Sequence, residues 1–191
     1  MHEGNDVRWL SAAALSLAIL ASGGMRSGGQ VAGAALALEP VQVPTRSLAP
    51  EEIRGLQEGE GMWLARAAEL NGFPGPAHIL EAARAGKIDL YAEQRQAIER
   101  IHAATKAKAQ ALGHQILAQE AALETTFRSG RIVEADLARQ VEDIGRKLAE
   151  LRLTHLRAHV LTAALLRPEQ IEEYYQYRGY AAPSPGHHLA Y

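Results

Sequence analysis

The chain has 191 residues, of which 47% are hydrophobic but only 5% aromatic, and it contains no cysteine. This composition suits one folded domain made of packed helices. The lack of cysteine excludes disulfides and thiolate sites, and a formal net charge of −2 argues against a general attraction to nucleic acid. We therefore expect an all-α protein that binds no nucleic acid.

Residues 1–37 have the pattern of an export segment. Arg8 precedes the apolar run Trp9–Ala21, which is shorter than the ~20 residues needed to span a bilayer but suits a signal-peptide core. Small residues at 21–23 and 35–37 offer two candidate cleavage sites. The alternatives are a retained membrane anchor and a buried helix. We expect a periplasmic protein that contacts the membrane only if the segment is retained.

A helical domain is predicted at residues 51–180, after a flexible linker at 38–50 that contains three prolines. The first helical stretch is expected from Glu51 to Leu70, interrupted by Gly55, Gly59 and Gly61, and it stops where the sequence NGFPGP forces a turn. A short helix is then expected to begin at Pro76, because proline fits the first helical turn without losing a needed hydrogen bond.

Two long helices are predicted in the second half of the chain. From about Ala92 to Arg128, apolar residues recur at three- and four-residue spacing, which places an apolar stripe along a helix roughly 50 Å long. The sequence RSGR supplies a turn, and the same spacing then continues to near Leu166. The expected architecture is a long antiparallel helical hairpin with shorter flanking helices.

The apolar stripes of this hairpin are predicted to form a contact face, because the short helices offer little mass to cover them. The face would then pack in a homodimer or bind a client protein. The alternative is that the short helices fold back and cover it. The predicted face consists of Ile98, Ile101, Leu112, Ile116, Leu123, Phe127, Leu137, Val141, Ile144, Leu148 and Leu151.

Two similar motifs, DLYAEQ at 89–94 and LLRPEQ at 165–170, precede predicted helices. In the later copy, Arg167 is expected to be the N-cap, so that Gln170 stands at the third helical position. A glutamine there reaches back to the backbone N–H of the cap residue. Gln94 has the same place in the earlier copy.

The segments LYAEQ and LRPEQ are similar to the Leu-Thr-x-x-Gln repeat of the Spy/CpxP superfamily of small periplasmic helical proteins, which includes the metal-related members ZraP and CnrX. The resemblance covers roughly residues 60–180 and extends to the closing sequence RGY. Tyr91 and Arg167 stand where the family has threonine, and neither is a good N-cap. The motif positions carried over from the family are Leu90, Gln94, Leu166 and Gln170.

The resemblance implies a periplasmic, cradle-shaped antiparallel dimer. The first activity that it implies is ATP-independent chaperone binding of unfolded envelope proteins under envelope stress. The alternative is a heavy-metal sensor or metal-binding regulator for nickel, cobalt, copper or zinc. A third possibility is an adaptor that inhibits an envelope-stress signalling protein.

The histidines support the metal alternative by their spacing. His155 and His159 are four residues apart on one helix face, where two imidazoles can share a divalent ion. The candidates for a further ligand are His78, above all, and His102 or His114. The structural alternatives are that His155 hydrogen-bonds a carboxylate of a neighbouring helix or lies exposed.

No catalytic motif is present, so we expect no enzyme activity and no required cofactor. Leu156 occupies the position that a metalloprotease motif gives to its general-base glutamate. There is also no nucleophile elbow, phosphate loop or dinucleotide fingerprint. Residues 181–191 are predicted to be a disordered tail, in which His187 and His188 are weaker metal candidates.

Overall fold

The computed structural model describes residues 45–180, and this part of the chain is all-α, as predicted. Its helices are α1 (Pro50–Glu58), α2 (Arg66–Glu69), α3 (Pro76–Arg84), α4 (Ala92–Ser129), α5 (Glu134–Ala163) and α6 (Pro168–Arg178). None of these helices combines the length and apolar character needed to cross a membrane. The predicted export segment, the first part of the linker and the tail at 181–191 lie outside the described residues.

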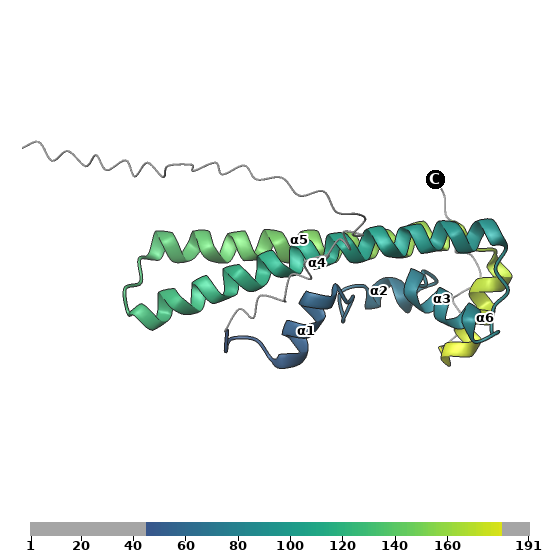
Figure 1. The fold of residues 1–191 in the computed structure, drawn as a ribbon, viewed down its shortest axis with the longest axis horizontal. Helices are drawn as coiled ribbons and strands as arrows, with labels where there is room; N and C mark the ends of the chain where they lie inside the picture. The colour runs from purple at the N-terminus through teal and green to yellow at the C-terminus, as the bar shows by residue number, and fades with distance from the viewer. Residues whose placement is uncertain (1–44, 181–191) are drawn as a thin grey trace, which may run out of the picture. The chain divides into compact units, whose positions relative to one another are not determined.

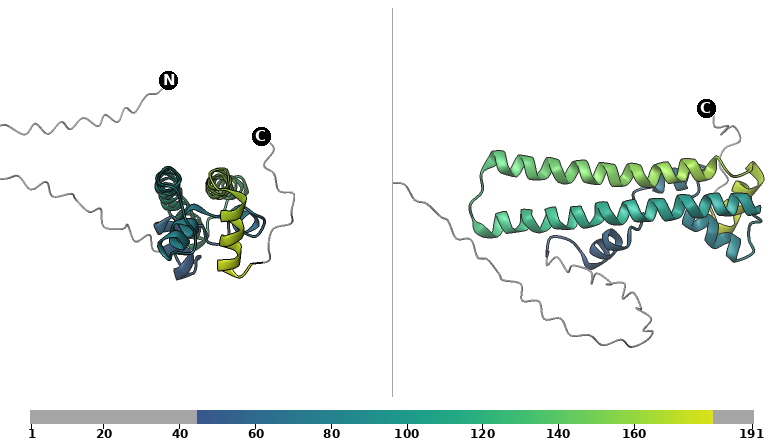
Figure 2. Two further views of the ribbon diagram at one scale, coloured as in Figure 1. Left: turned by 90° about the vertical axis from the view of Figure 1, so that its right-hand side faces the viewer. Right: turned by 45° about the horizontal axis from the view of Figure 1, so that its top comes forward.

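Helices α4 and α5 are the longest elements, and they run antiparallel, side by side (Figures 1 and 2). Helix α4 ends at Gly130, whose φ of 66° is a left-handed conformation that glycine adopts at little steric cost. The chain turns there, and α5 begins at Glu134. The short connection at residues 130–133 therefore lets α5 return alongside α4.

The four short helices lie on one side of the α4–α5 pair (Figures 1 and 2). Helix α1 packs on α4, and α3 packs on α4, α5 and α6. Two apolar clusters hold these contacts together. The base cluster, where α3 and α6 meet the pair, includes Ile79, Leu80, Ile98, Tyr174 and Tyr175. The central cluster beneath α1 includes Leu56, Leu64, Leu112, Ile116, Leu117 and Leu151.

The helical stretch predicted from Glu51 to Leu70 is interrupted at Gly59, as predicted, where φ is 68°. The interruption predicted at Gly55 is wrong, because Gly55 lies within α1. Residues 60–65 form a turn before the four-residue α2. Helix α1 lies so close to α4 that a Cβ added to Gly113 would come within 1.9 Å of the backbone oxygen of Leu56. The break lets α1 pack on α4 while the next segment crosses toward α5.

The last residues of the predicted linker are fixed on α4 rather than free. Thr45 Oγ1 and the Arg46 backbone N–H donate to Glu124 Oε2 at 3.0 and 2.7 Å. Arg46 Nε and Arg128 Nη2 donate to Glu124 Oε1 at 2.9 and 2.7 Å. These hydrogen bonds, the backbone bond from Arg46 above all, lower the pKa of Glu124 to about 2. The carboxylate is therefore the anchor for the start of the described chain.

The two glutamine motifs meet in the folded chain. Each side-chain Oε1 accepts the backbone N–H of its own N-cap residue, as predicted, at 3.0 Å for Gln94 and 2.9 Å for Gln170. The two side-chain amides also hydrogen-bond each other at 3.0 and 3.1 Å. Their remaining hydrogens reach the carbonyl oxygens of Leu165 and Asp89, at 2.7 and 2.6 Å. This glutamine pair joins the start of α4 to the start of α6.

The predicted contact face is only partly exposed. Five of its residues are buried by the opposite long helix and the short helices, so the prediction is wrong for Ile98, Leu112, Ile116, Ile144 and Leu151. Ile101, Leu123 and Leu137 are half-buried. Phe127, Val141 and Leu148 are 53%, 53% and 40% exposed. The tip surface, defined as Leu123, Phe127, Leu137 and Val141, lies on the parts of α4 and α5 nearest the turn at Gly130. The pair extends beyond the short helices toward this turn (Figure 1).

Candidate functional site

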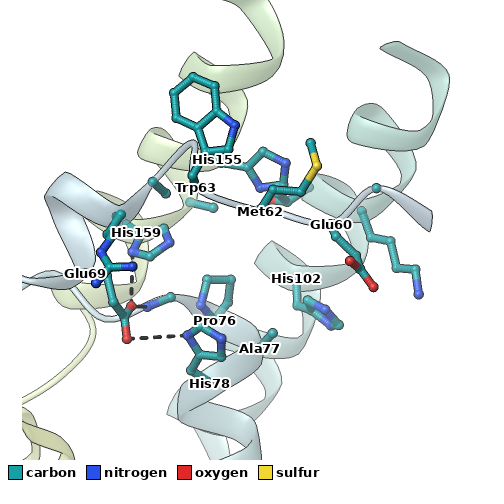
Figure 3. A pocket seen from close by; sticks show the side chains of 18 of the residues that line it. Glu60, Met62, Trp63, Glu69, Pro76, Ala77, His78, His102, His155 and His159 are labelled. Carbon is teal, nitrogen blue, oxygen red and sulfur yellow. Dashed lines mark hydrogen bonds and ion pairs between the residues drawn. The ribbon is translucent and has the colours of Figure 1, made fainter. Parts of the chain in front are cut away.

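A pocket of about 710 Å³ opens between the α4–α5 pair and the segment that joins α1 to α3 (Figure 3). Four of the five histidines within residues 45–180 line it, namely His78, His102, His155 and His159. The fifth, His114, is exposed on α4 outside the lining. The same lining contains the carboxylate of Glu69 and the thioether of Met62. The pocket therefore concentrates the side chains that bind transition metals.

His155 and His159 lie one turn apart on α5, and they are only 7% and 9% exposed. Two glycines give the imidazole rings room. A Cβ on Gly61 would lie 3.5 Å from His155 Nδ1, and a Cβ on Gly75 would lie 2.9 Å from His159 Nε2. The backbone of the α1–α3 segment thus packs directly on both rings.

Glu69, in α2, is a buried carboxylate at the end of this pocket. The Gly75 backbone N–H donates to its Oε2 at 3.1 Å, and the hydroxyl of Tyr174 donates to its Oε1. His78 Nδ1 lies 3.4 Å from Oε1, and His159 Nδ1 lies 3.6 Å from Oε2 (Figure 3). Glu69 therefore links α2 to side chains from α3, α5 and α6.

The charge state of Glu69 reflects opposing effects. Burial favours the neutral acid, but the contacts with His78 and Tyr174 and the backbone N–H of Gly75 outweigh it and lower the pKa of Glu69 below its usual value. The carboxylate is therefore ionised at neutral pH. It places a buried negative charge beside two imidazole rings.

The two α5 histidines are neutral at pH 7. Burial lowers the pKa of His159, although its contacts with Phe73 and Glu69 oppose the shift. Burial and the neighbouring His159 lower the pKa of His155. His159 Nδ1 lies 2.6 Å from the carbonyl oxygen of Phe73, so this nitrogen carries the hydrogen and donates it. Nε2 of His159 then keeps its lone pair, which is the form that binds a metal ion.

The structure thus brings three predicted metal candidates, His78, His155 and His159, together with His102, and it leaves His114 apart. His187 and His188 lie outside the described residues. Within residues 45–180, no group of three or more His, Asp or Glu side chains is already arranged to hold a metal ion. The family-motif residues line no part of the pocket and lie in or beside the base cluster.

Sequence reasoning missed Glu69, Tyr174 and Met62. No local pattern marks Glu69, because its hydroxyl partner lies 105 residues later in the chain. A carboxylate in an amphipathic segment is most often solvated, so its burial has no sequence signal. The available signal was that Met62 lies in the glycine-rich break between two helices and Glu69 follows shortly after it.

In comparisons with known proteins, no family model matches the chain, and no curated protein and no solved structure shows significant similarity to it.

Proposed function

We propose that this chain binds a divalent transition-metal ion in the histidine pocket and acts as a periplasmic metal-responsive regulator, the heavy-metal alternative of the Spy/CpxP resemblance. One observation carries the proposal: four of the five described histidines line one pocket together with the ionised, buried Glu69. Imidazole and carboxylate are ligands that zinc, nickel, cobalt and copper accept. The carboxylate also offsets the charge of the ion.

Glu69, His78 and His159 are the residues best placed to hold the ion. His78 Nδ1 and Glu69 Oε1 lie 3.4 Å apart, close to the roughly 3.3 Å between donors of a tetrahedral site with bonds of ~2.0 Å. His159 would bind through Nε2, because its Nδ1 hydrogen is donated to Phe73. The side chain of His78 is 42% exposed, so its ring has room to turn toward the ion.

Calorimetric titration of the full chain with nickel, cobalt, copper and zinc tests this proposal. We expect His78→Ala to lower the affinity for the preferred ion at least tenfold and to leave the helical circular dichroism spectrum unchanged. His114→Ala is the matched control, because it removes an exposed histidine outside the pocket. Equal affinities for the wild type and His78→Ala would refute the site.

The tip surface supports a second candidate function, ATP-independent chaperone binding of unfolded envelope proteins. Phe127 and Val141 are each 53% exposed and continue the apolar stripes that are buried farther along the same helices. Exposed apolar surface of this kind binds partner proteins or a second copy of the chain. The proposed homodimer would use this surface.

Suppression of client aggregation by the purified protein tests the second candidate. Replacing Phe127 and Val141 by serine should abolish suppression, and any dimer seen by sedimentation should also be lost. Leu153→Ser is the control, because Leu153 is 43% exposed but lies outside the tip surface. Full suppression by the double variant would rule out the tip surface as the client-binding site.

Recovery of the full-length protein in the cytoplasmic fraction would contradict the predicted export to the periplasm.

A further inference from the structure

Met62 has a backbone conformation that its side chain does not favour. Its φ is 45°, and it is the only non-glycine residue between 45 and 180 with a positive φ. Side chains with a Cβ rarely adopt this region, and long unbranched ones have no local hydrogen bond to offset the strain. Glycine would fit the position without strain. Strained residues cluster at ligand sites, so this outlier raises the question of what the thioether does.

The strained backbone directs the Met62 thioether into the wall of the pocket. A Cβ added to Gly55 would come within 2.6 Å of Met62 Sδ, so the sulfur rests on the bare backbone of α1. Met62 is still 41% exposed and lines the pocket. The thioether is therefore held by packing on one side and remains open on the other.

His155 packs on the residue that precedes Met62. The residue before Met62, Gly61, packs on the His155 ring, with the ring Nδ1 3.5 Å from the position of a Cβ. Figure 3 shows Met62, from the segment that joins α1 to α3, and His155, from α5, toward one end of the pocket and Glu69 and His78 toward the other. His155 is only 7% exposed, and its Nε2 has no hydrogen-bond partner. A buried imidazole without a partner and a strained thioether line the same pocket, and together they point to an ion that accepts both donors.

We propose that Met62 and His155 form a subsite for a soft monovalent metal ion, Cu(I), distinct from the divalent site at Glu69. Thioether sulfur selects Cu(I) over zinc and nickel, and imidazole nitrogen also suits copper. Both donors are neutral, so a monovalent ion leaves less uncompensated charge in this part of the pocket than a divalent ion. The subsite extends the proposed function, because it adds a second class of ion to the same pocket.

Titration of the full chain with Ag(I), a redox-inert probe for Cu(I), tests the subsite, and anaerobic titration with Cu(I) against a competing chelator repeats the test. Met62→Leu keeps the volume and removes the sulfur, whereas Met62→Gly also relieves the backbone. We expect both variants to bind Ag(I) and Cu(I) at least tenfold more weakly and to bind zinc and nickel as the wild type does. Met62→Gly should melt at the same or a higher temperature.

The reciprocal variant separates this inference from the proposed function. His78→Ala should lower the affinity for divalent ions and leave the affinity for Ag(I) unchanged. X-ray absorption of the Cu(I) complex should show one sulfur neighbour, which Met62→Leu removes. Unchanged Ag(I) affinity in Met62→Leu, or a first shell without sulfur, overturns the subsite whatever the divalent ions do. Failure of the wild type to bind any divalent ion, with Ag(I) binding intact, would overturn only the site at Glu69.

Discussion

The hydrogen atom that serves as the side chain of Gly113 allows α1 to approach α4 closely. We expect Gly113→Ala to destabilise the fold by about 1–3 kcal/mol, because the new methyl group would meet the backbone of Leu56 and push α1 outward. Denaturant unfolding followed by circular dichroism measures the change. Since the obstacle is backbone, no side-chain rotation can relieve the clash.

Gly145→Ala is the matched control for this contact. Gly145 lies within α5, and a Cβ there would meet nothing within 4 Å. Alanine should stabilise the helix at this position by up to about 1 kcal/mol. If Gly113→Ala is tolerated as well as Gly145→Ala, the close packing of α1 on α4 is incorrect.

Glu124 gives a pH-dependent contribution to stability. Its pKa falls from the usual 4.5 to about 2 in the folded chain, so the folded state favours the carboxylate. The stabilisation is present above the unfolded pKa and is lost as the pH falls through the folded value. Chemical denaturation between pH 5 and pH 2 should therefore show a smaller loss of stability in Glu124→Gln than in the wild type. Parallel pH profiles would contradict the anchoring of Arg46.

At the scale of the elements, the glutamine pair predicts strong coupling between α4 and α6. Gln170 is 1% exposed, and loss of either amide leaves buried polar groups without partners. In a double-mutant cycle, Gln94→Ala and Gln170→Ala should each destabilise the fold by about 1–3 kcal/mol or more. Their coupling energy should be at least about 0.5 kcal/mol.

The control for the cycle is Gln176→Ala, on the exposed side of α6. Paired with Gln94→Ala, it should give additive changes in the free energy of unfolding. Additive changes for Gln94 and Gln170 as well would mean that the two motifs act only as independent helix caps.

Helix positions were predictable where one periodic pattern ran between clear breaks. The apolar period placed α4 and α5 to within a few residues, and Pro76 and Pro168 marked the starts of α3 and α6. The segment from Glu51 to Leu70 was not predictable in the same way. Its three glycines fit either a weakened helix or a break, and only packing against α4 decides between them.

The pocket was predictable only in part, for a similar reason. The spacing of His155 and His159 places them on one helix face, but a helical pattern cannot say which distant segment covers that face. Glu69 reaches them because the break after α1 carries the chain across to α5. Residue pairs joined across such distances have no signature in a single sequence.

At the scale of the whole molecule, local stability should be uneven. The α4 residues of both apolar clusters lie within 98–117, and the central cluster also contains Leu151 of α5. Neither cluster therefore includes a residue of 118–150. Amides near the turn at Gly130 should therefore exchange through local opening, while those of 98–117 should approach the global free energy of unfolding. Hydrogen exchange measured by mass spectrometry distinguishes the two segments. Uniform protection along α4 would contradict this expectation.

The contact between Gln94 and Gln170 also constrains the order in which the molecule can be completed. The two amides are separated by 76 residues, and the hydroxyl of Tyr174 meets Glu69 across 105 residues. A chain that emerges from its amino end can form most of α4 and the start of α5 before either contact exists. Contacts between residues this far apart in the sequence form slowly, because closing the chain between them has an entropic cost. The contacts that α6 makes with the pocket and with the start of α4 therefore form only when α6 folds. Docking of this last helix is the step that completes the fold.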